Sequence, residues 1–354
     1  MATTNNKLAK DTSLQSILLA NQSIAAAEQA RNTTLAAMLA EMQSRSTDIQ
    51  AWKDAVISLS TADKAALASA IYEVLGLNNS AQKSAQALPD IYAILDDNAN
   101  AENGAALHNS LPRCKNLGSA LTADQHARIA DKTFKGLWVG DYIQKQITFS
   151  YTNSSDASAT ATATHKGRFL DMNYWLRCGD VECTVSHIAM ACDDVFFTNK
   201  MNDTDVTTGG YYNSKMKQTY LAGALNAFKA LVGENHILTH KDLLSNAMAD
   251  NQASGYAWYS TQIDLMSEPM VYGGFHHTPA TKNGSRVWDR YTVGTQQLSL
   301  FRHCKNFSFI RANWYWLREV VSAAWFASVS HVGYSGTIYA SLAAGGVRPF
   351  ILFY

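Results

Sequence analysis

Apolar residues recur with heptad spacing over residues 14–59. With Leu14 as position a and Ile17 as position d, ten of the fourteen a and d positions are apolar, which predicts a long amphipathic helix. Such a helix exposes an apolar stripe that needs a partner, so the pattern predicts a coiled coil, and we expect a homotrimer. A helix that folds back on the next helix of its own chain is the alternative.

Shorter helical patterns and a polar stretch follow. A second helix is predicted to begin near Thr61, whose side chain can cap it, and a short helical piece is expected at 90–95. Residues 96–112 are polar and rich in Gly and Asn, which predicts a linker. The N-terminal part is therefore divided into an oligomerising helix at 1–60 and a short helical region with a linker at 61–120.

From residue 121 onward the pattern changes to short strands and helices. Alternating or continuously apolar segments predict strands at 147–151, 166–175 and 187–197. Helical patterns are found at 122–129 and, with apolar residues on one side, from Met216 to Leu231. The segments predicted to be irregular are 152–164, rich in Ser, Thr and Ala, and 256–274, with a turn at Pro269 and a short strand. The lack of βαβ repetition favours an α+β domain over a doubly wound sheet.

Composition describes a globular protein and favours no strongly charged partner. Of 354 residues, 47% are hydrophobic and 16% are charged, and the net charge is zero. Nothing in this balance favours nucleic acid or an anionic membrane as a partner. No apolar run is long enough to span a bilayer, and no basic-then-apolar signal segment opens the sequence, so we expect folding in a cytoplasm and no membrane insertion.

Recognisable catalytic and metal-binding motifs are sparse in the sequence. The spacing of Cys178, Cys183 and Cys192 does not match a zinc site, so the five cysteines are expected to be buried free thiols. His236 and His240 lie four residues apart, but no Glu follows His236 as in a zinc protease, so a surface or capping role is expected. We predict no catalytic residue, no metal and no cofactor.

The last forty residues combine two aromatic-rich blocks with an interior of a different kind. The blocks run from Asn313 to Phe326 and from Gly345 to Tyr354, and small residues interleaved with unrelated side chains lie between them. Because an unpaired buried arginine is costly, Arg318 and Arg348 are expected to donate hydrogen bonds to carbonyls or a carboxylate. The apolar residues expected to be mostly buried are Trp314, Trp316, Val347 and Phe350. Such an arrangement suits the display of side chains rather than one reaction.

Residues 121–354 resemble the variable proteins of diversity-generating retroelements. The segments that carry the resemblance are Phe134–Tyr142, Met201–Met216, Leu265–Gly273, Trp316–Arg318 and Gly346–Pro349. The resemblance implies a C-type-lectin-like ligand-binding domain with a variable segment at about 325–346. Those retroelements chiefly mutate adenines in Asn-type codons, which cannot give Trp, Lys, Glu, Gln or Met, and residues 328–344 contain none of these five.

The resemblance also implies a function and a set of ligand-facing residues. The implied set is Ser328, Ser330, His331, Val332, Tyr334, Gly336, Thr337, Ile338, Tyr339 and Leu342. Tyr334 and Tyr339 are the expected anchors, since tyrosine offers contact area at low entropy cost. The expected protein is a phage receptor-binding protein, a tail fibre or adhesin in the virion, that binds a host-cell-surface protein or glycan and contacts other virion proteins through its N-terminal region.

Three other interpretations stay open. An ordinary irregular loop would explain the tail without a binding role. A structural decoration or adaptor protein of the virion would depend on the first hundred residues instead. Formylglycine-generating enzymes share the lectin-like fold, but they need a reactive cysteine pair late in the chain, and here only Cys304 lies beyond Cys192.

Overall fold

The computed structural model describes residues 21–23, 25–36, 91–278 and 296–354. The chain divides into two units, Met1–Pro89 and Asp90–Tyr354. In the first unit the described residues are helical and exposed, including the heptad residue Leu35, which is 54% exposed. The other apolar heptad residues and the helix expected from Thr61 lie outside the described residues, so the coiled coil stays a prediction.

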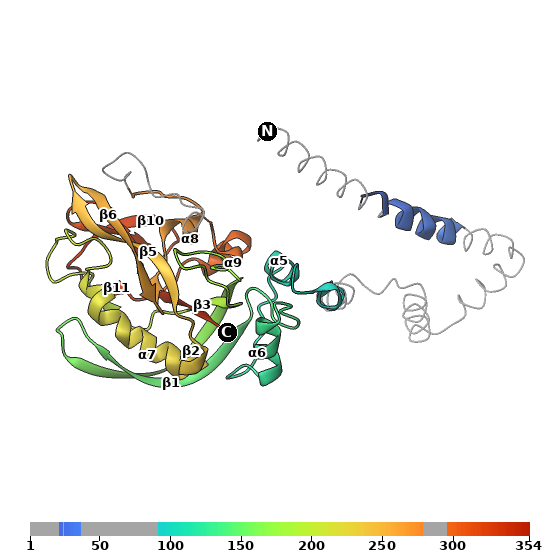
Figure 1. Ribbon diagram of the computed structural model, residues 1–354, viewed down its shortest axis with the longest axis horizontal. Coiled ribbons are helices and arrows are strands. Elements are labelled where there is room, and N and C mark those ends of the chain that lie inside the picture. The colour runs from blue at the N-terminus through green and yellow to red at the C-terminus, as the bar shows by residue number, and fades with distance from the viewer. Residues whose placement is uncertain (1–20, 24, 37–90, 279–295) are drawn as a thin grey trace, which may run out of the picture. The chain divides into compact units, whose positions relative to one another are not determined.

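The second unit contains two five-stranded sheets and a two-stranded ribbon (Figure 1). The first sheet contains, in spatial order, β1 (Tyr142–Thr152), β2 (Ser158–Met172), β3 (Ile188–Cys192), β12 (Pro349–Phe353) and β7 (Asp264–Leu265). The second contains β10 (Ser335–Tyr339), β9 (Trp325–Val329), β8 (Tyr315–Val320), β11 (Gly345–Gly346) and β4 (Thr198–Asn199). The ribbon pairs β5 (His240–Ala249) with β6 (Gln252–Thr261). Among these paired strands only β8 and β11 run parallel.

Short helices pack around the sheets. They are a helical segment at 91–98, α5 (Gly104–Ser110), α6 (Ala123–Ala130), α7 (Leu221–Val232), α8 (Glu268–Tyr272) and α9 (Ser299–His303). A π-helical turn, η1 (Met216–Tyr220), precedes α7, and the 3₁₀ turns are η2 (Glu234–His236) and η3 (Lys305–Phe307). Helix α7 lies along β1 (Figure 1), and Gly223 permits the close approach, because a Cβ there would lie 2.4 Å from Tyr151 Cβ.

Apolar side chains cover both faces of the first sheet. Every residue of β3 and β12 is buried. Along β12 the side chains alternate, with Ile351 and Phe353 in one core cluster and Phe350 and Leu352 in the other. The last strand of the chain thus lies between β3 and β7 and contributes to both cores.

Several sequence predictions are confirmed. The helix expected at 122–129 is α6, and Thr122 caps it by accepting from Gln125 N at 3.2 Å while Gln125 Oε1 accepts from Thr122 N at 2.8 Å. The amphipathic pattern forms η1 and α7, which bury Met216 and Phe228. The coarse α+β class also holds, since helices combine with largely antiparallel sheets.

The predicted loop at 152–164 is wrong, because most of it is strand. Strands β1 and β2 form a hairpin whose connection is only 153–157. The segment from Ser158 alternates Ala with β-branched Thr, a pattern that suits a pleated ribbon. Thr148 and Thr162 face each other across the pair with their hydroxyls 2.8 Å apart. The low hydrophobicity of this segment concealed the strand.

Two other irregular segments are also more ordered than predicted. Residues 96–112, predicted as a linker, contain α5, and its His108 is buried with Nε2 2.7 Å from Asp96 Oδ1. Residues 256–274, predicted as a loop with a turn at Pro269 and a short strand, contain the end of β6, the short strand β7 and helix α8. Pro269 lies in the first turn of α8, where its missing N–H costs nothing, and Ser267 caps the helix.

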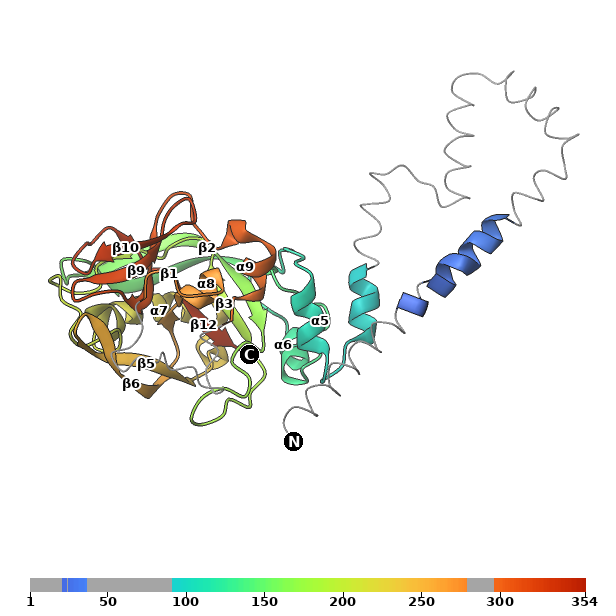
Figure 2. The ribbon, with the colours of Figure 1, turned by 90° about the horizontal axis from the view of Figure 1, so that it is seen from above.

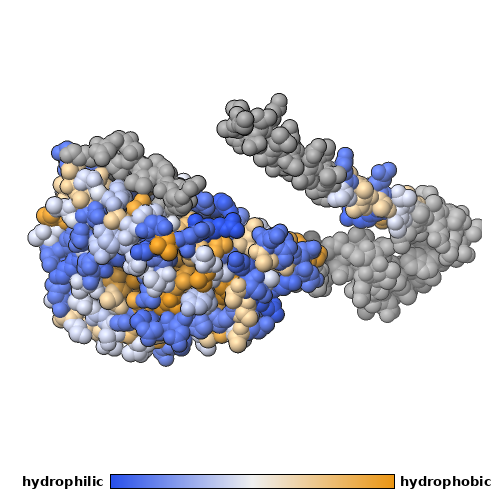
Figure 3. Space-filling view, viewed as in Figure 1, coloured by the Kyte–Doolittle hydropathy of each residue, from blue (hydrophilic) through white to orange (hydrophobic). Residues whose placement is uncertain are grey.

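The surface of the second unit is ordinary for a globular protein. On the face drawn in Figure 3, apolar residues form small groups among hydrophilic ones. Within the described ranges, no helix combines the length and the apolar character needed to cross a membrane. In Figure 2 the β9–β10 hairpin and the β5–β6 ribbon lie on opposite sides of the domain.

Candidate functional site

The two aromatic-rich blocks of the tail form a buried frame, made of β8, β11 and β12. Arg318 forms an ion pair with Asp242 of β5. Arg348 donates hydrogen bonds to the carbonyls of Cys192 and Phe307, each at 2.9 Å. The polar contacts predicted for both arginines are therefore confirmed, with one carboxylate and two carbonyls as acceptors.

Tryptophan packing completes this frame. Trp316 is buried, and its Nε1 donates to Asn199 O at 2.7 Å. Gly345 lies directly beside it, since a Cβ there would come within 2.0 Å of Trp316 Nε1. Val347 and Phe350 are buried as predicted, whereas Trp314 is only partly buried against Trp316 at 4.8 Å. The close contact between Gly345 and Trp316 thus holds the two aromatic-rich blocks of the tail against each other.

Between these blocks, β9 and β10 form an antiparallel hairpin. Among the described strands β10 stands at the edge of its sheet, so one side of it has no neighbouring strand. The register places Tyr339 opposite Trp325, and the rings meet edge to face at 5.2 Å. An edge strand offers both side chains and unpaired backbone groups to an approaching partner.

Large apolar side chains are concentrated on this hairpin and the turn after it. The exposed fractions are 52% for Val332, 73% for Tyr334, 53% for Tyr339 and 45% for Leu342. His331 is exposed as well. These five residues, with the half-buried Ser330 and Thr337, are called the display surface below.

Three residues of the implied ligand-facing set lie elsewhere. Ser328 is buried at 3% exposure, which corrects its assignment as a contact residue. Its β9 position faces inward, and Gly336 opposite it would place a Cβ 3.0 Å from Ser328 Oγ. Ile338 is partly buried against the core cluster that contains Phe326. By alternation Ser328, Gly336 and Ile338 share one face of the hairpin, and Gly336 and Ile338 are partly buried there.

The turn between the two strands is held in one shape. Ser330 N donates to Tyr334 O at 2.8 Å, and Tyr334 N donates to Ser330 Oγ at 2.9 Å. Gly333 has a φ of 87° and approaches Phe309, whose ring would lie 2.9 Å from a Cβ at this position. Tyr334 is therefore presented on a defined turn.

A residue that sequence reasoning missed borders the display surface. His277 Nε2 lies 3.2 Å from Ser335 Oγ at the start of β10. The segment that carries it is tied to the buried carboxylate of Glu268, which accepts from the amides of His276, His277 and Thr278 at 3.2, 3.1 and 3.2 Å. The contact between His277 and Ser335 joins residues nearly sixty positions apart, so no local pattern could have revealed it.

Beneath this segment two carboxyl groups lie close together. Glu319 accepts from Glu268 N at 2.9 Å through Oε2. Burial, reinforced by the negative charge of Glu268 and opposed by Arg318, raises the pKa of the Glu319 carboxyl to about 8. Glu319 is therefore largely protonated at neutral pH, which avoids two adjacent buried charges.

The histidine pair His236 and His240 and the five cysteines lie in different surroundings. His236 stacks on His126 at 3.9 Å, whereas His240 is buried at the start of β5, and burial lowers its pKa to about 3. No group of three or more His, Cys, Asp or Glu side chains in the described ranges could hold a metal ion. All five cysteines are free, but only Cys178 and Cys192 are buried, so the predicted burial holds for these two.

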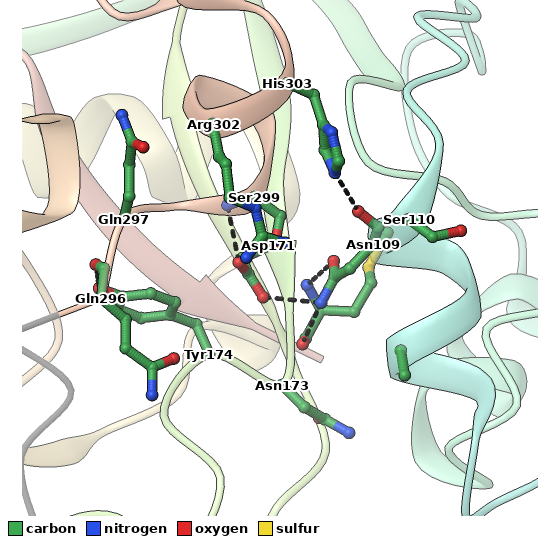
Figure 4. A pocket seen from close by; sticks show the side chains of 12 residues that line it. Asn109, Ser110, Asp171, Asn173, Tyr174, Gln296, Gln297, Ser299, Arg302 and His303 are labelled. Carbon is green, nitrogen blue, oxygen red and sulfur yellow. Dashed lines mark hydrogen bonds between the residues drawn. The ribbon is translucent and has the colours of Figure 1, made fainter. Parts of the chain in front are cut away.

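A separate cavity of about 640 Å³ opens between α5, the end of β2 and α9 (Figure 4). Its wall contains Asn109, Asp171, Ser299 and Arg302, and it shares no residue with the display surface.

Comparison with protein-family models finds no match, and comparisons with curated proteins and with solved structures find none either. The candidate site is therefore defined by its own geometry. A rigid, buried frame holds an edge hairpin whose exposed residues are largely apolar or aromatic.

Proposed function

We propose that this chain is a receptor-binding protein of a phage virion and that the display surface binds a protein or glycan on a host cell. The observation that carries the proposal is the concentration of exposed apolar side chains. Of the eleven large hydrophobic residues exposed in the described ranges, four lie between Val332 and Leu342. Grouped exposed apolar and aromatic residues are typical of contact surfaces, and tyrosine is frequent among the residues that dominate binding energy.

The frame supports the same proposal. Side chains on an exposed, well-held loop can change with little effect on folding, while a buried frame preserves the backbone that presents them. The resemblance to variable proteins of diversity-generating retroelements, with a C-type-lectin-like fold, belongs to this proposal. The proposal also includes the expectation that the chain catalyses no reaction.

Oligomerisation through the N-terminal helix is the second part of the proposal. A homotrimer joined at residues 14–59 would link three display surfaces and raise a weak single-site affinity by roughly a hundredfold or more. The exposed Leu35, at heptad position a, supports this part because it has no cover within the described chain.

Sedimentation of the full chain tests the oligomer. We expect a trimer that Leu35→Asp weakens, while Thr33→Asp, on the outer heptad position of the same helix, leaves it unchanged. A compact monomer at micromolar concentration would contradict the trimer.

The display surface is tested by changing Val332, Tyr334, Tyr339 and Leu342 together to Ser. Labelled wild-type protein should bind at least one strain of a bacterial panel, and the variant should bind that strain about 30-fold more weakly or worse, which corresponds to about 2 kcal/mol. The matched control changes the exposed Val181 and Val185 to Ser and should bind normally.

The alternative function is a structural virion decoration or adaptor protein without receptor binding. It predicts that both variants assemble into virions and that adsorption is the same for both. Normal adsorption of the display-surface variant would therefore favour this alternative.

A further inference from the structure

The cavity beside α9 has a rigid polar wall. Asn109 of α5 donates to Asp171 Oδ1 at 2.8 Å and to Met172 O at 3.0 Å, and it accepts from Met172 N at 2.8 Å. Ser299 N donates to Asp171 Oδ2 at 2.9 Å. These bonds join a helix, a strand end and the start of α9 around one carboxylate (Figure 4). The wall is therefore fixed by bonds between three separate segments.

The Asp171 carboxylate retains hydrogen-bonding capacity. The carboxylate accepts from the Asn109 side chain and from both the backbone and the side chain of Ser299, while its two oxygens together can accept four bonds. Burial raises the pKa of this carboxyl to about 6, and its bonds to Ser299 and Asn109 oppose that rise. The group is thus mostly ionised at neutral pH and can accept from a ligand.

A cation lies near this carboxylate without bonding to it. Arg302, on the same side of the cavity, lowers the pKa of Asp171 through its charge, yet the two form no ion pair within the described chain. The guanidinium carries five N–H donors that no described residue accepts from. The guanidinium of Arg302, as donor, and the carboxylate of Asp171, as acceptor, therefore line the same cavity.

This pairing selects among ligand types. A small anion would meet the Asp171 charge, and a small cation would meet the Arg302 charge. A neutral group that both donates and accepts fits the two at once, and a hydroxyl does so by donating to the carboxylate and accepting from the guanidinium. Neighbouring hydroxyls on one ring would repeat this pattern along the wall.

We propose that the cavity is a binding site for a neutral saccharide, with a sugar hydroxyl bridging Asp171 and Arg302. The volume of about 640 Å³ is adequate for a mono- or disaccharide. Tyr174 lies on the cavity wall, where it is buried and held by the hydrogen bond from its hydroxyl to Gln296 O. The site is independent of the display surface.

Saturation-transfer NMR on the full chain tests the site with glucose, galactose, mannose, N-acetylglucosamine, lactose and maltose as probes. At least one should bind, and calorimetry should give a Kd that rises at least about tenfold in Arg302→Ala and in Asp171→Asn. The control Arg311→Ala removes an exposed arginine that does not line the cavity and should bind normally.

Folding and binding are separable here. Arg302 is exposed, so Arg302→Ala should keep the wild-type melting temperature even if Asp171→Asn does not. The fourfold display-surface variant should keep its sugar affinity, which distinguishes this site from the receptor surface. Absence of binding by all six sugars would overturn the proposal. Affinity unchanged in Arg302→Ala, or binding of inorganic phosphate rather than sugars, would also overturn it.

Discussion

The frame and the display surface lie next to each other in the tail, yet they use their side chains in opposite ways. In the frame, Arg318 and Arg348 are buried and bonded to groups from distant parts of the chain. On the display surface, Tyr334 and Tyr339 are more than half exposed. The comparison indicates that folding energy and contact surface are assigned to different residues within forty positions.

Glycines also have different roles in the frame and in the turn of the display surface. Gly345 lets the frame close over Trp316, where any side chain would overlap the indole. Gly333 instead allows a turn with positive φ, which sets the direction of the neighbouring Tyr334. Both positions reject larger residues, one for packing and the other for presentation.

The largest expected effect is in the frame, at the ion pair of β8. Arg318→Met leaves the buried Asp242 without its partner, and breaking a buried pair costs about 3–5 kcal/mol. At roughly 2–4 °C per kcal/mol for a unit of this size, the melting temperature should fall by about 10 °C. Adding Asp242→Leu should restore part of that loss. A fall below about 2 °C in the single variant would contradict the role given to the pair.

Arg348 should show a smaller loss. Arg348→Ala removes two hydrogen bonds and leaves the buried carbonyl of Cys192 unsatisfied at about 1–3 kcal/mol, and the partly buried carbonyl of Phe307 at a smaller cost because water can reach it. Denaturant unfolding should give a loss of about 2–4 kcal/mol. The exposed Arg311 is the matched control, and its change to Ala should alter stability by less than about 0.5 kcal/mol.

The pH dependence of stability tests the protonation of Glu319, which lies beside the Glu268 carboxylate that holds the His277 segment. The folded-state pKa of Glu319, about 8, lies above the ordinary value of 4.5, so folding favours its protonated form. Its contribution is complete below about pH 4.5 and is lost as the pH rises towards 8. The difference in unfolding free energy between the wild type and Glu319→Gln should therefore shift in favour of the variant over this range. A constant difference would show that folding does not raise the pKa of Glu319.

Local patterns in the sequence predicted elements well where one face is strongly apolar. Helix α7 and strand β3 have continuous or periodic apolar residues, and Thr122 carries a recognisable cap. The patterns failed where order depends on tertiary contacts. Helix α5 looked like a linker because the segment 96–112 is polar and rich in Gly and Asn, and its stability comes from contacts such as the one between His108 and Asp96.

The candidate site was predictable only in part. The exposed Val332, Tyr334 and Tyr339 agree with the expected surface, because a small-residue scaffold leaves larger side chains conspicuous. Ser328 was misassigned, since strand alternation could not be phased without the register of β9. His277 and the cavity at Asp171 involve residues brought together across long separations, which no spacing in the sequence encodes.

The smallest expected effects separate the two tyrosines of the display surface. Tyr339 packs edge to face on Trp325, a contact worth about 0.5–1.5 kcal/mol, so Tyr339→Ser should lower stability by about 1 kcal/mol. Tyr334 is 73% exposed on the turn, and Tyr334→Ser should change stability by less than about 0.5 kcal/mol. Both substitutions should nevertheless weaken cell binding. A stability loss above about 2 kcal/mol for Tyr334→Ser would place this residue with the frame, and the separation of folding from contact within the tail would fail at its most exposed position.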